Sequence, residues 1–125
     1  MNETTAAGAI CPLYHRAAEL IGRRWTGAIV LALAGGAVRF GDLAAAVPGI
    51  SDRMLSERLK ELEAEGLLAR TVLPEHPVRI EYRLTEKGRD LDAVMAAIGA
   101  WAVRWLAPAG PIPAVAQAPG AAIPG

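Results

Sequence analysis

The spacing of the hydrophobic positions changes along the chain, and each change marks a new secondary-structure element. Residues 25–33 are apolar on nearly every side, which is typical of a helix buried at the centre of a domain. Pro12 suits the first turn of a preceding helix, and Pro48 with Gly49 breaks the chain after a third, short helix. This half of the chain therefore predicts helices over 13–21, 25–33 and 41–47 and a short strand over 38–40.

A longer amphipathic helix is predicted directly after this break, from residue 51 to residue 65. Ser51 is a good N-cap, and Gly66 supplies the left-handed residue that ends many helices. At roughly 100° per residue, Leu55, Leu59 and Leu62 fall on one side of this helix. Charged side chains occupy the other sides, so the helix has one face for the core and one free face.

The last third of the chain predicts a two-stranded ribbon and a long final helix. Residues 68–73 and 79–84 have strand patterns on either side of a turn that holds two prolines. The second strand alternates: Ile80, Tyr82 and Leu84 are expected to face inward, and Arg79, Glu81 and Arg83 outward. Thr85 can cap the final helix, whose apolar stripe consists of Leu91, Val94, Met95, Ile98, Trp101, Trp105 and Leu106.

This order of short helix, turn, longer helix and charged ribbon is the layout of a winged helix-turn-helix. We therefore expect a mainly α fold with a small β-ribbon. A helix with one packed and one free face fits the major groove of DNA, and the neighbouring ribbon can reach the phosphate backbone. The expected organisation is a flexible N-terminus over 1–10, a winged helix-turn-helix domain over 11–106 and a disordered Pro/Gly/Ala tail over 107–125.

Composition narrows the class of protein. With 125 residues, 53% of them hydrophobic, the chain suits one domain with a substantial core and no separate catalytic domain. No stretch approaches the apolar length of a membrane span, and residues 1–10 lack the pattern of a signal peptide, so we expect a cytoplasmic protein without membrane contact. The single cysteine excludes an intrachain disulfide and a zinc site built from several cysteines.

The net charge is zero and the isoelectric point is near 6.7, so the overall charge does not favour nucleic acid. DNA binding then requires positive charge that is concentrated on one face. In the helix over 51–65, three glutamates lie toward the C-terminal end, whereas Arg53 and Arg58 lie in the first half, which usually enters the groove. The local distribution of charge therefore favours DNA binding although the sum does not.

Base contacts are expected from this helix. The guanidinium fork of Arg53 or Arg58 matches the two acceptors of guanine, and the carboxylate of Glu57 can accept from cytosine. The alternative is that these charges only solvate a helix face. Together with expected phosphate contacts, the predicted DNA-binding set is Arg39, Ser51, Arg53, Met54, Glu57, Arg58, His76 and Arg79.

Phosphate contacts are expected from cations beside the helix, because most protein–DNA contacts go to the backbone. Arg39 precedes the helix-turn-helix, and His76 and Arg79 belong to the ribbon. Two other cations of the ribbon can equally pair with an acid across the strands, Arg70 and Arg83 with Glu81.

The single cysteine has two interpretations. Cys11 precedes Pro12 at a helix start, where the helix dipole favours a thiolate, and His15 follows four residues later. A reactive thiol sensor is one interpretation, and a small apolar residue that fills a dimer seam is the other. Cys11 and His15 also resemble half of a metal site or a nucleophile with its base, but no third ligand, orienting carboxylate or oxyanion loop is identifiable. We therefore expect no metal, no cofactor and no enzyme.

The tryptophans predict an interface. Trp25 is expected in the core, whereas Trp101 and Trp105 lie four residues apart on a terminal helix that has little core left to cover. Their surplus apolar surface predicts a homodimer interface shared with Leu13 and Ile98. The alternative is that both tryptophans pack on the first helix of the same chain. Two symmetrically paired winged helices predict a pseudo-palindromic operator with half-sites about one helical turn apart.

From Cys11 to Leu106 the chain resembles the HxlR-type winged helix regulators of bacteria. The resemblance is carried by a series of strings in order and register: Cys11-Pro12, Leu20-Ile21-Gly22 with Trp25-Thr26, Arg39-Phe40-Gly41-Asp42-Leu43, Pro48-Gly49-Ile50-Ser51, Met54-Leu55 to Leu59, Leu62-Glu63 with Gly66-Leu67, and Val78 to Thr85 with Gly88.

This resemblance implies homodimers that bind operator DNA and pair through their N-terminal and C-terminal helices. It also implies a thiol sensor, because several members respond to thiol-reactive or oxidising compounds through a cysteine near the N-terminus, a position that Cys11 matches. The chain departs from the pattern at Leu73, where an aromatic residue is common, and at His76, where an apolar residue is common. These departures concern the contacts of the ribbon and not the fold.

The sequence therefore predicts a dimeric, sequence-specific transcriptional regulator bound to double-stranded DNA, with repression as the expected sign. Its signal is either an electrophile or oxidant acting at Cys11 or a small apolar ligand bound between helices near the tryptophans. A winged helix that serves only as a protein-interaction module is the alternative, and the neutral net charge is its main support.

Overall fold

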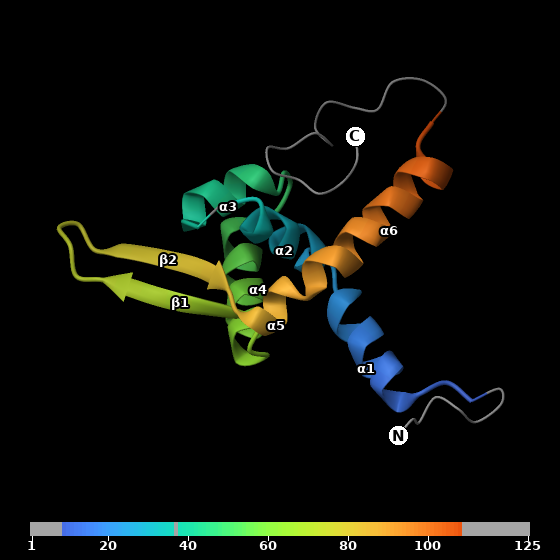
Figure 1. The fold of residues 1–125 in the computed structure, drawn as a ribbon. Coiled ribbons are helices and arrows are strands. Elements are labelled where there is room, and N and C mark those ends of the chain that lie inside the picture. Colours follow the sequence, from blue (N-terminus) through green and yellow to red (C-terminus); the bar gives the residue numbers. More distant parts are fainter. Residues whose placement is uncertain (1–8, 37, 109–125) are drawn as a thin grey trace.

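The computed structural model describes residues 9–36 and 38–108, which form a mainly helical domain with one hairpin (Figure 1). The predicted flexible N-terminus and tail lie outside these residues, except for residues 9, 10, 107 and 108. The elements in chain order are α1 (Pro12–Ile21), α2 (Thr26–Ala34), α3 (Phe40–Ala46), α4 (Asp52–Ala64), β1 (Leu68–Leu73), β2 (Arg79–Leu84), α5 (Glu86–Arg89) and α6 (Leu91–Leu106).

Helix α2 lies at the centre, as its apolar composition predicts. Ile29 and Val30 are fully buried, and α2 contacts α1, α3, α6 and β2. A buried cluster joins α2 to one face each of α3 and α4, to the base of the hairpin and to α6. This single core fixes α4 relative to the hairpin, and both are elements from which DNA contacts are predicted.

Helix α4 begins and ends where the sequence predicts. The Oγ of Ser51 accepts a hydrogen bond from the backbone N–H of Met54 at 3.1 Å, which caps the N-terminus. Three leucines of α4, at positions 55, 59 and 62, are buried on its inner face. Gly66 has a φ of 77°, in the left-handed region that glycine adopts without steric cost, so the chain can turn into β1.

The two strands pair in antiparallel register from Leu68 opposite Leu84 to Leu73 opposite Arg79. Only the base of the hairpin is buried, because Leu68 and Leu84 belong to the core while the remaining positions of β1 are exposed or half-buried. The rest of the ribbon extends away from the helical body (Figure 1). This is the geometry of a wing.

Two sequence predictions are corrected here. The predicted strand over 38–40 does not form: the carbonyl of Val38 accepts one hydrogen bond from the N–H of Tyr82 at 2.8 Å, and the chain then enters α3 at Phe40. The predicted continuous final helix is two helices joined at Asp90, with Thr85 capping α5 through the N–H of Gly88 at 3.1 Å.

Helices α1 and α6 extend from the body on the side away from the wing (Figure 1). Helix α1 has no buried residue, and only Met95 and Gly99 are buried in α6. Within the described ranges, no helix combines the length and apolar character needed to cross a membrane.

Candidate nucleic-acid interface

The first half of α4 presents the free face that its sequence pattern predicts. The side chain of Arg53 is 89% exposed, and Ser51 and Glu57 are also exposed, while Met54 is half-buried at the edge of the face. The Nε of Arg53 lies 3.3 Å from Oε2 of Glu57. A solvent-exposed ion pair one turn apart is weak, so the guanidinium can exchange this partner for a base or phosphate.

The predicted phosphate contacts gather at the tip of the wing. Arg39, His76 and Arg79 line one hollow of about 310 Å³ between the start of α3 and the turn of the hairpin. Arg39 and His76 are exposed. The fold thus brings Arg39 beside His76 and Arg79, two neighbouring residues of the hairpin that are distant from Arg39 in the sequence.

Arg79 lies between two carboxylates of the hairpin. Its Nε lies 3.7 Å from Oε1 of Glu75, and its Nη1 lies 3.5 Å from Oε2 of Glu81. Glu81 was predicted to face outward, but its side chain is only 14% exposed and also accepts from Arg83 at 3.1 Å. The carboxylate of Glu81 is covered because Arg79 and Arg83, two residues before and after it on β2, both pair with it. The predicted pairing of Arg83 with Glu81 is confirmed, although it runs along β2 and not across the ribbon.

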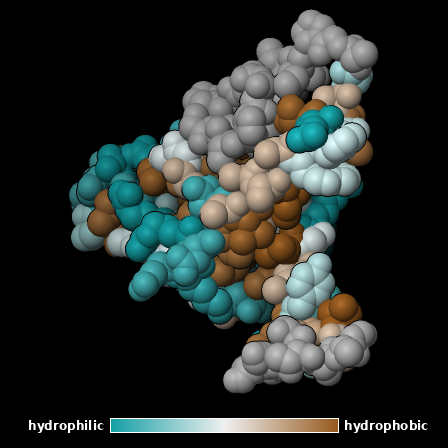
Figure 2. All heavy atoms as spheres, turned by 45° about the vertical axis from the view of Figure 1, so that its right-hand side comes forward, coloured by the Kyte–Doolittle hydropathy of each residue, from teal (hydrophilic) through white to brown (hydrophobic). Residues whose placement is uncertain are grey.

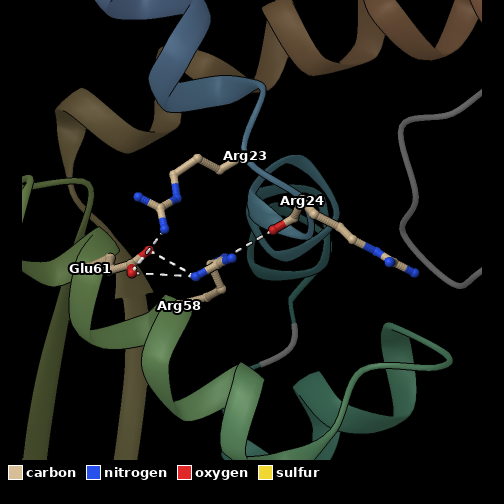
Figure 3. Close-up of polar contacts among 4 residues, drawn as sticks. All are labelled: Arg23, Arg24, Arg58 and Glu61. Carbon is tan, nitrogen blue, oxygen red and sulfur yellow. Dashed lines mark hydrogen bonds and ion pairs between the residues drawn. The ribbon is translucent and has the colours of Figure 1, made fainter.

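Arg58 was predicted as a candidate base contact, and this prediction is corrected. Its side chain is only 12% exposed, and its Nε donates to the carbonyl oxygen of Arg24 at 3.0 Å (Figure 3). Its Nη1 donates to Oε1 of Glu61 at 3.2 Å. The reason is that the segment before α2 covers this flank of α4 and satisfies the guanidinium, so Arg58 is a structural residue and not a candidate base contact.

Two cations that the sequence analysis did not select lie beside α4. Lys60 and Arg70 line a hollow between α4 and β1 together with Ser56, Glu63 and Tyr82. Both cations are exposed. Strand alternation places Arg70 on the same face of β1 as the buried Leu68 and opposite Tyr82. This position becomes informative only once that face of β1 is known to lie against α4. We add Lys60 and Arg70 to the candidate phosphate contacts.

Cys11 lies at the N-cap position of α1 and is a free thiol that is 7% exposed. His15 is exposed and its ring meets the ring of Tyr14 edge-on, with the centroids 6.1 Å apart. Among the residues that the structure describes, no group of three or more His, Cys, Asp or Glu side chains is arranged to hold a metal ion.

The predicted interface residues are exposed on the single chain. Trp101 is 59% exposed and Trp105 is 62% exposed, and Leu13 and Ile98 are also more than half exposed. Figure 2 shows apolar surface gathered on the side where α1 and α6 come forward, whereas the side of the wing is hydrophilic. Any packing of the two tryptophans within the same chain therefore covers less than half of each residue. Trp25, in contrast, packs against the core as predicted.

Comparison with known proteins gives consistent results. Residues 20–109 match the family described as HxlR-like helix-turn-helix. The chain is 48% identical over 99 residues to the uncharacterized HTH-type transcriptional regulator YvaP of Bacillus subtilis, covering 79% of this chain and 92% of YvaP. It is 46% identical over 99 residues to the HTH-type transcriptional regulator YodB of the same organism, with coverage of 79% and 88%.

Solved structures show the same fold. The reduced form of YodB from B. subtilis aligns with a TM-score of 0.68 at 45% identity, covering 78% of this chain and 95% of YodB. YodB has also been solved with quinone bound, at a TM-score of 0.64 and 43% identity, covering 77% of this chain and all of that one. The redox regulator HypR in its oxidized form aligns with a TM-score of 0.69 at 34% identity, covering 75% and 96%. The chain belongs to the HxlR-like helix-turn-helix family and is a transcriptional regulator with a winged helix DNA-binding fold.

Proposed function

We propose that the protein binds a pseudo-palindromic operator as a homodimer, with one α4 in each of two major grooves. The observation that carries this proposal is the division of α4 into two faces. Three leucines anchor one face in the core, while Arg53 extends from the other with 89% of its side chain exposed. Such a helix can enter a groove without disturbing the fold, and its arginine fork matches the acceptors of guanine.

The surroundings of α4 support this orientation. Two groups of cations accompany α4: Arg39, His76 and Arg79 line the hollow between the start of α3 and the hairpin turn, and Lys60 and Arg70 line the hollow between α4 and β1. Phosphates that flank a major groove would meet these side chains while Arg53 reaches the bases. The neutral net charge of the chain does not exclude this arrangement, because phosphate binding depends on the side chains that face the duplex, and Arg39, Arg53, Lys60 and Arg70 are all exposed.

Arg53→Ala is expected to weaken operator binding about 10- to 100-fold, because a bidentate base contact contributes about 1–3 kcal/mol to discrimination. Fluorescence anisotropy with a labelled operator duplex, repeated at several salt concentrations, measures this change. Arg53→Lys is the matched control: it keeps the charge and the salt dependence but loses the fork, so it should lose sequence discrimination and keep non-specific affinity. Affinity that is indifferent to salt and to Arg53→Ala would contradict the proposal.

We further propose that the bound dimer represses transcription. A small DNA-binding domain of this kind can block a promoter by occupying it, without a further domain to contact the transcription machinery. A reporter gene under the operator tests the sign, since deletion of the regulator should raise expression.

We also propose that modification of the Cys11 thiol releases the DNA. The support is its position at the start of α1, next to the exposed apolar surface expected to form the dimer. Further support comes from two solved relatives, the redox regulator HypR and the quinone-bound YodB. An adduct larger than a thiol does not fit at a side chain that is 7% exposed, so α1 must move to accept it.

Treatment with a quinone is therefore expected to weaken DNA binding by the parent protein at least about 10-fold, and to leave Cys11→Ser unaffected. Anisotropy before and after treatment, with intact-mass analysis of the adduct, provides the measurement. An equal loss in both proteins would remove Cys11 as the sensor and favour the second candidate signal, a small apolar ligand bound near Trp101 and Trp105, whose exposed rings offer such a ligand a surface.

A further inference from the structure

The loop between α1 and α2 contacts α4, the proposed recognition helix, and the turn before it. Trp25 in this loop has a φ of 80°, a left-handed conformation that is costly for a residue with a side chain. Its ring approaches the turn that precedes α4, since a Cβ added to Gly49 would lie 3.6 Å from Cη2 of Trp25. The Arg24 guanidinium stacks over the same ring at 4.6 Å from its centroid. The loop is therefore held in one specific conformation against the helix-turn-helix.

Glu61 of α4 is the polar connection between this loop and the recognition helix (Figure 3). Its Oε2 accepts from Nη2 of Arg23 at 3.3 Å, and its carboxylate also accepts from Nη1 of Arg58 at 3.2 and 3.3 Å. Arg58 in turn donates to the carbonyl of Arg24 at 3.0 Å. A single carboxylate thus joins α4 to Arg23, two residues after the end of α1.

The attachment of α1 to the core allows a movement of this helix to reach Glu61. Helix α1 has no buried residue, and its main attachment to the core is through Leu20 and Ile21 at its C-terminal end. Arg23 follows this end by two residues. A displacement of α1 that moves Arg23 would therefore reach the C-terminal part of α4 through Glu61.

The charges explain why the carboxylate is needed. Arg58 is 12% exposed, so its guanidinium depends on protein groups in place of water. Without Glu61, Arg58 would keep its bond to the carbonyl of Arg24 but would lose its carboxylate partner, and the half-exposed Arg23 would lose its contact with α4. The loop and α4 would then share one polar contact fewer.

We propose that Glu61 is a positioning residue that holds α4 in the orientation required for specific operator binding and transmits displacements of α1 to it. This inference rests on the proposed DNA binding. Glu61 lies on the flank of α4 that meets the loop, so it acts on DNA only through the position of the helix and not by contact with it.

The test compares Glu61→Gln with Glu63→Gln. Both substitutions remove one negative charge from the same end of α4, but Glu63 is exposed and lies on the side toward Lys60 and Arg70. Removal of an acid from a DNA-binding protein strengthens phosphate attraction, so Glu63→Gln should bind operator as well as the parent or better. Glu61→Gln is expected to bind the operator about 10-fold more weakly, while its affinity for a scrambled duplex should not fall.

A second readout does not require DNA. The chain has three tryptophans, so in a Trp101→Phe, Trp105→Phe background the fluorescence reports Trp25 alone. Adding Glu61→Gln should shift the Trp25 emission to longer wavelength and increase its quenching by acrylamide, and adding Glu63→Gln should not. This readout separates the two proposals, because it responds to the loop even if the parent protein binds no duplex.

Three outcomes would overturn the positioning role of Glu61. The first is operator affinity of Glu61→Gln equal to that of Glu63→Gln. The second is an equal fall in specific and scrambled-duplex affinity, which would indicate loss of folded protein and not of orientation. The third is Trp25 fluorescence that Glu61→Gln leaves unchanged. A parent protein without salt-dependent duplex binding would instead contradict the proposed function itself.

Discussion

Replacing Gly88 with alanine is expected to lower the free energy of unfolding by about 3 kcal/mol, at the upper end of overpacking costs. Gly88 is buried in α5, and a Cβ there would collide with the carbonyl oxygen of Leu67 and lie 3.0 Å from Cδ2 of Leu84. The carbonyl cannot simply move, because it accepts the N–H of Thr85 at 3.0 Å. Urea denaturation followed by circular dichroism measures the change.

Gly41→Ala is the matched control for this substitution. Gly41 is also a helical glycine, but it is exposed, and no described heavy atom beyond its neighbours comes within 4 Å of an added Cβ. Alanine is favoured over glycine in a helix by about 0.5–1 kcal/mol, so this variant should be slightly more stable than the parent. If Gly88→Ala and Gly41→Ala lower the free energy of unfolding equally, the close contact with the carbonyl of Leu67 is not the reason that position 88 requires glycine.

Elements with strong local signals could be predicted from the sequence. The bounds of β1 and β2 agree with the two predicted strands, and α4 begins and ends at the residues marked by Ser51 and Gly66. These signals are local because a cap, a left-handed glycine and a strand alternation depend on neighbours within a few positions. The winged helix layout followed from the order of these elements, and the solved relatives have the same fold.

Contacts between distant segments could not be predicted in the same way. Helical periodicity places Arg58 on the flank of α4, but the carbonyl that it binds belongs to Arg24, 34 positions earlier. The predicted strand at Val38 failed for a related reason. Val38 does bond to Tyr82 of β2, but α3 begins two residues later and leaves no length for a strand. Hydrophobic periodicity and secondary-structure propensity describe one segment by itself. Contacts with distant segments decide where that segment ends and which groups it binds.

The candidate site was predicted in part. The exposed position of Arg53 and the position of Arg39, His76 and Arg79 beside one another are compatible with the predicted DNA-binding set, and their base and phosphate contacts stay predictions. Lys60 and Arg70 were missed, because neither strand nor helix pattern shows that β1 lies against α4. The sequence shows which side chains can bind bases or phosphates. Only the fold shows which of them lie on the same face.

Substituting both Trp101 and Trp105 with alanine is expected to raise the dissociation constant of the proposed homodimer at least about 100-fold. Buried tryptophans at an interface commonly contribute about 2 kcal/mol or more each, and a twofold interface contains each of them twice. Both rings are about 60% exposed on the single chain, at 59% and 62%, so their removal takes little from the core of the protomer. Sedimentation equilibrium over a range of concentrations measures the dissociation constant.

Val72→Ala is the control for this loss, because Val72 is a 50% exposed apolar residue on β1, on the wing and away from the α1 and α6 surface. It should leave dimerisation unchanged. The double tryptophan variant should also lose most of its affinity for a full operator but bind a duplex with one half-site as the parent does, since each α4 and its wing remain folded. The twofold arrangement would be contradicted if the parent protein sedimented as a monomer and bound a full operator no more tightly than the double tryptophan variant. The exposed tryptophans would then have to be explained by a different partner.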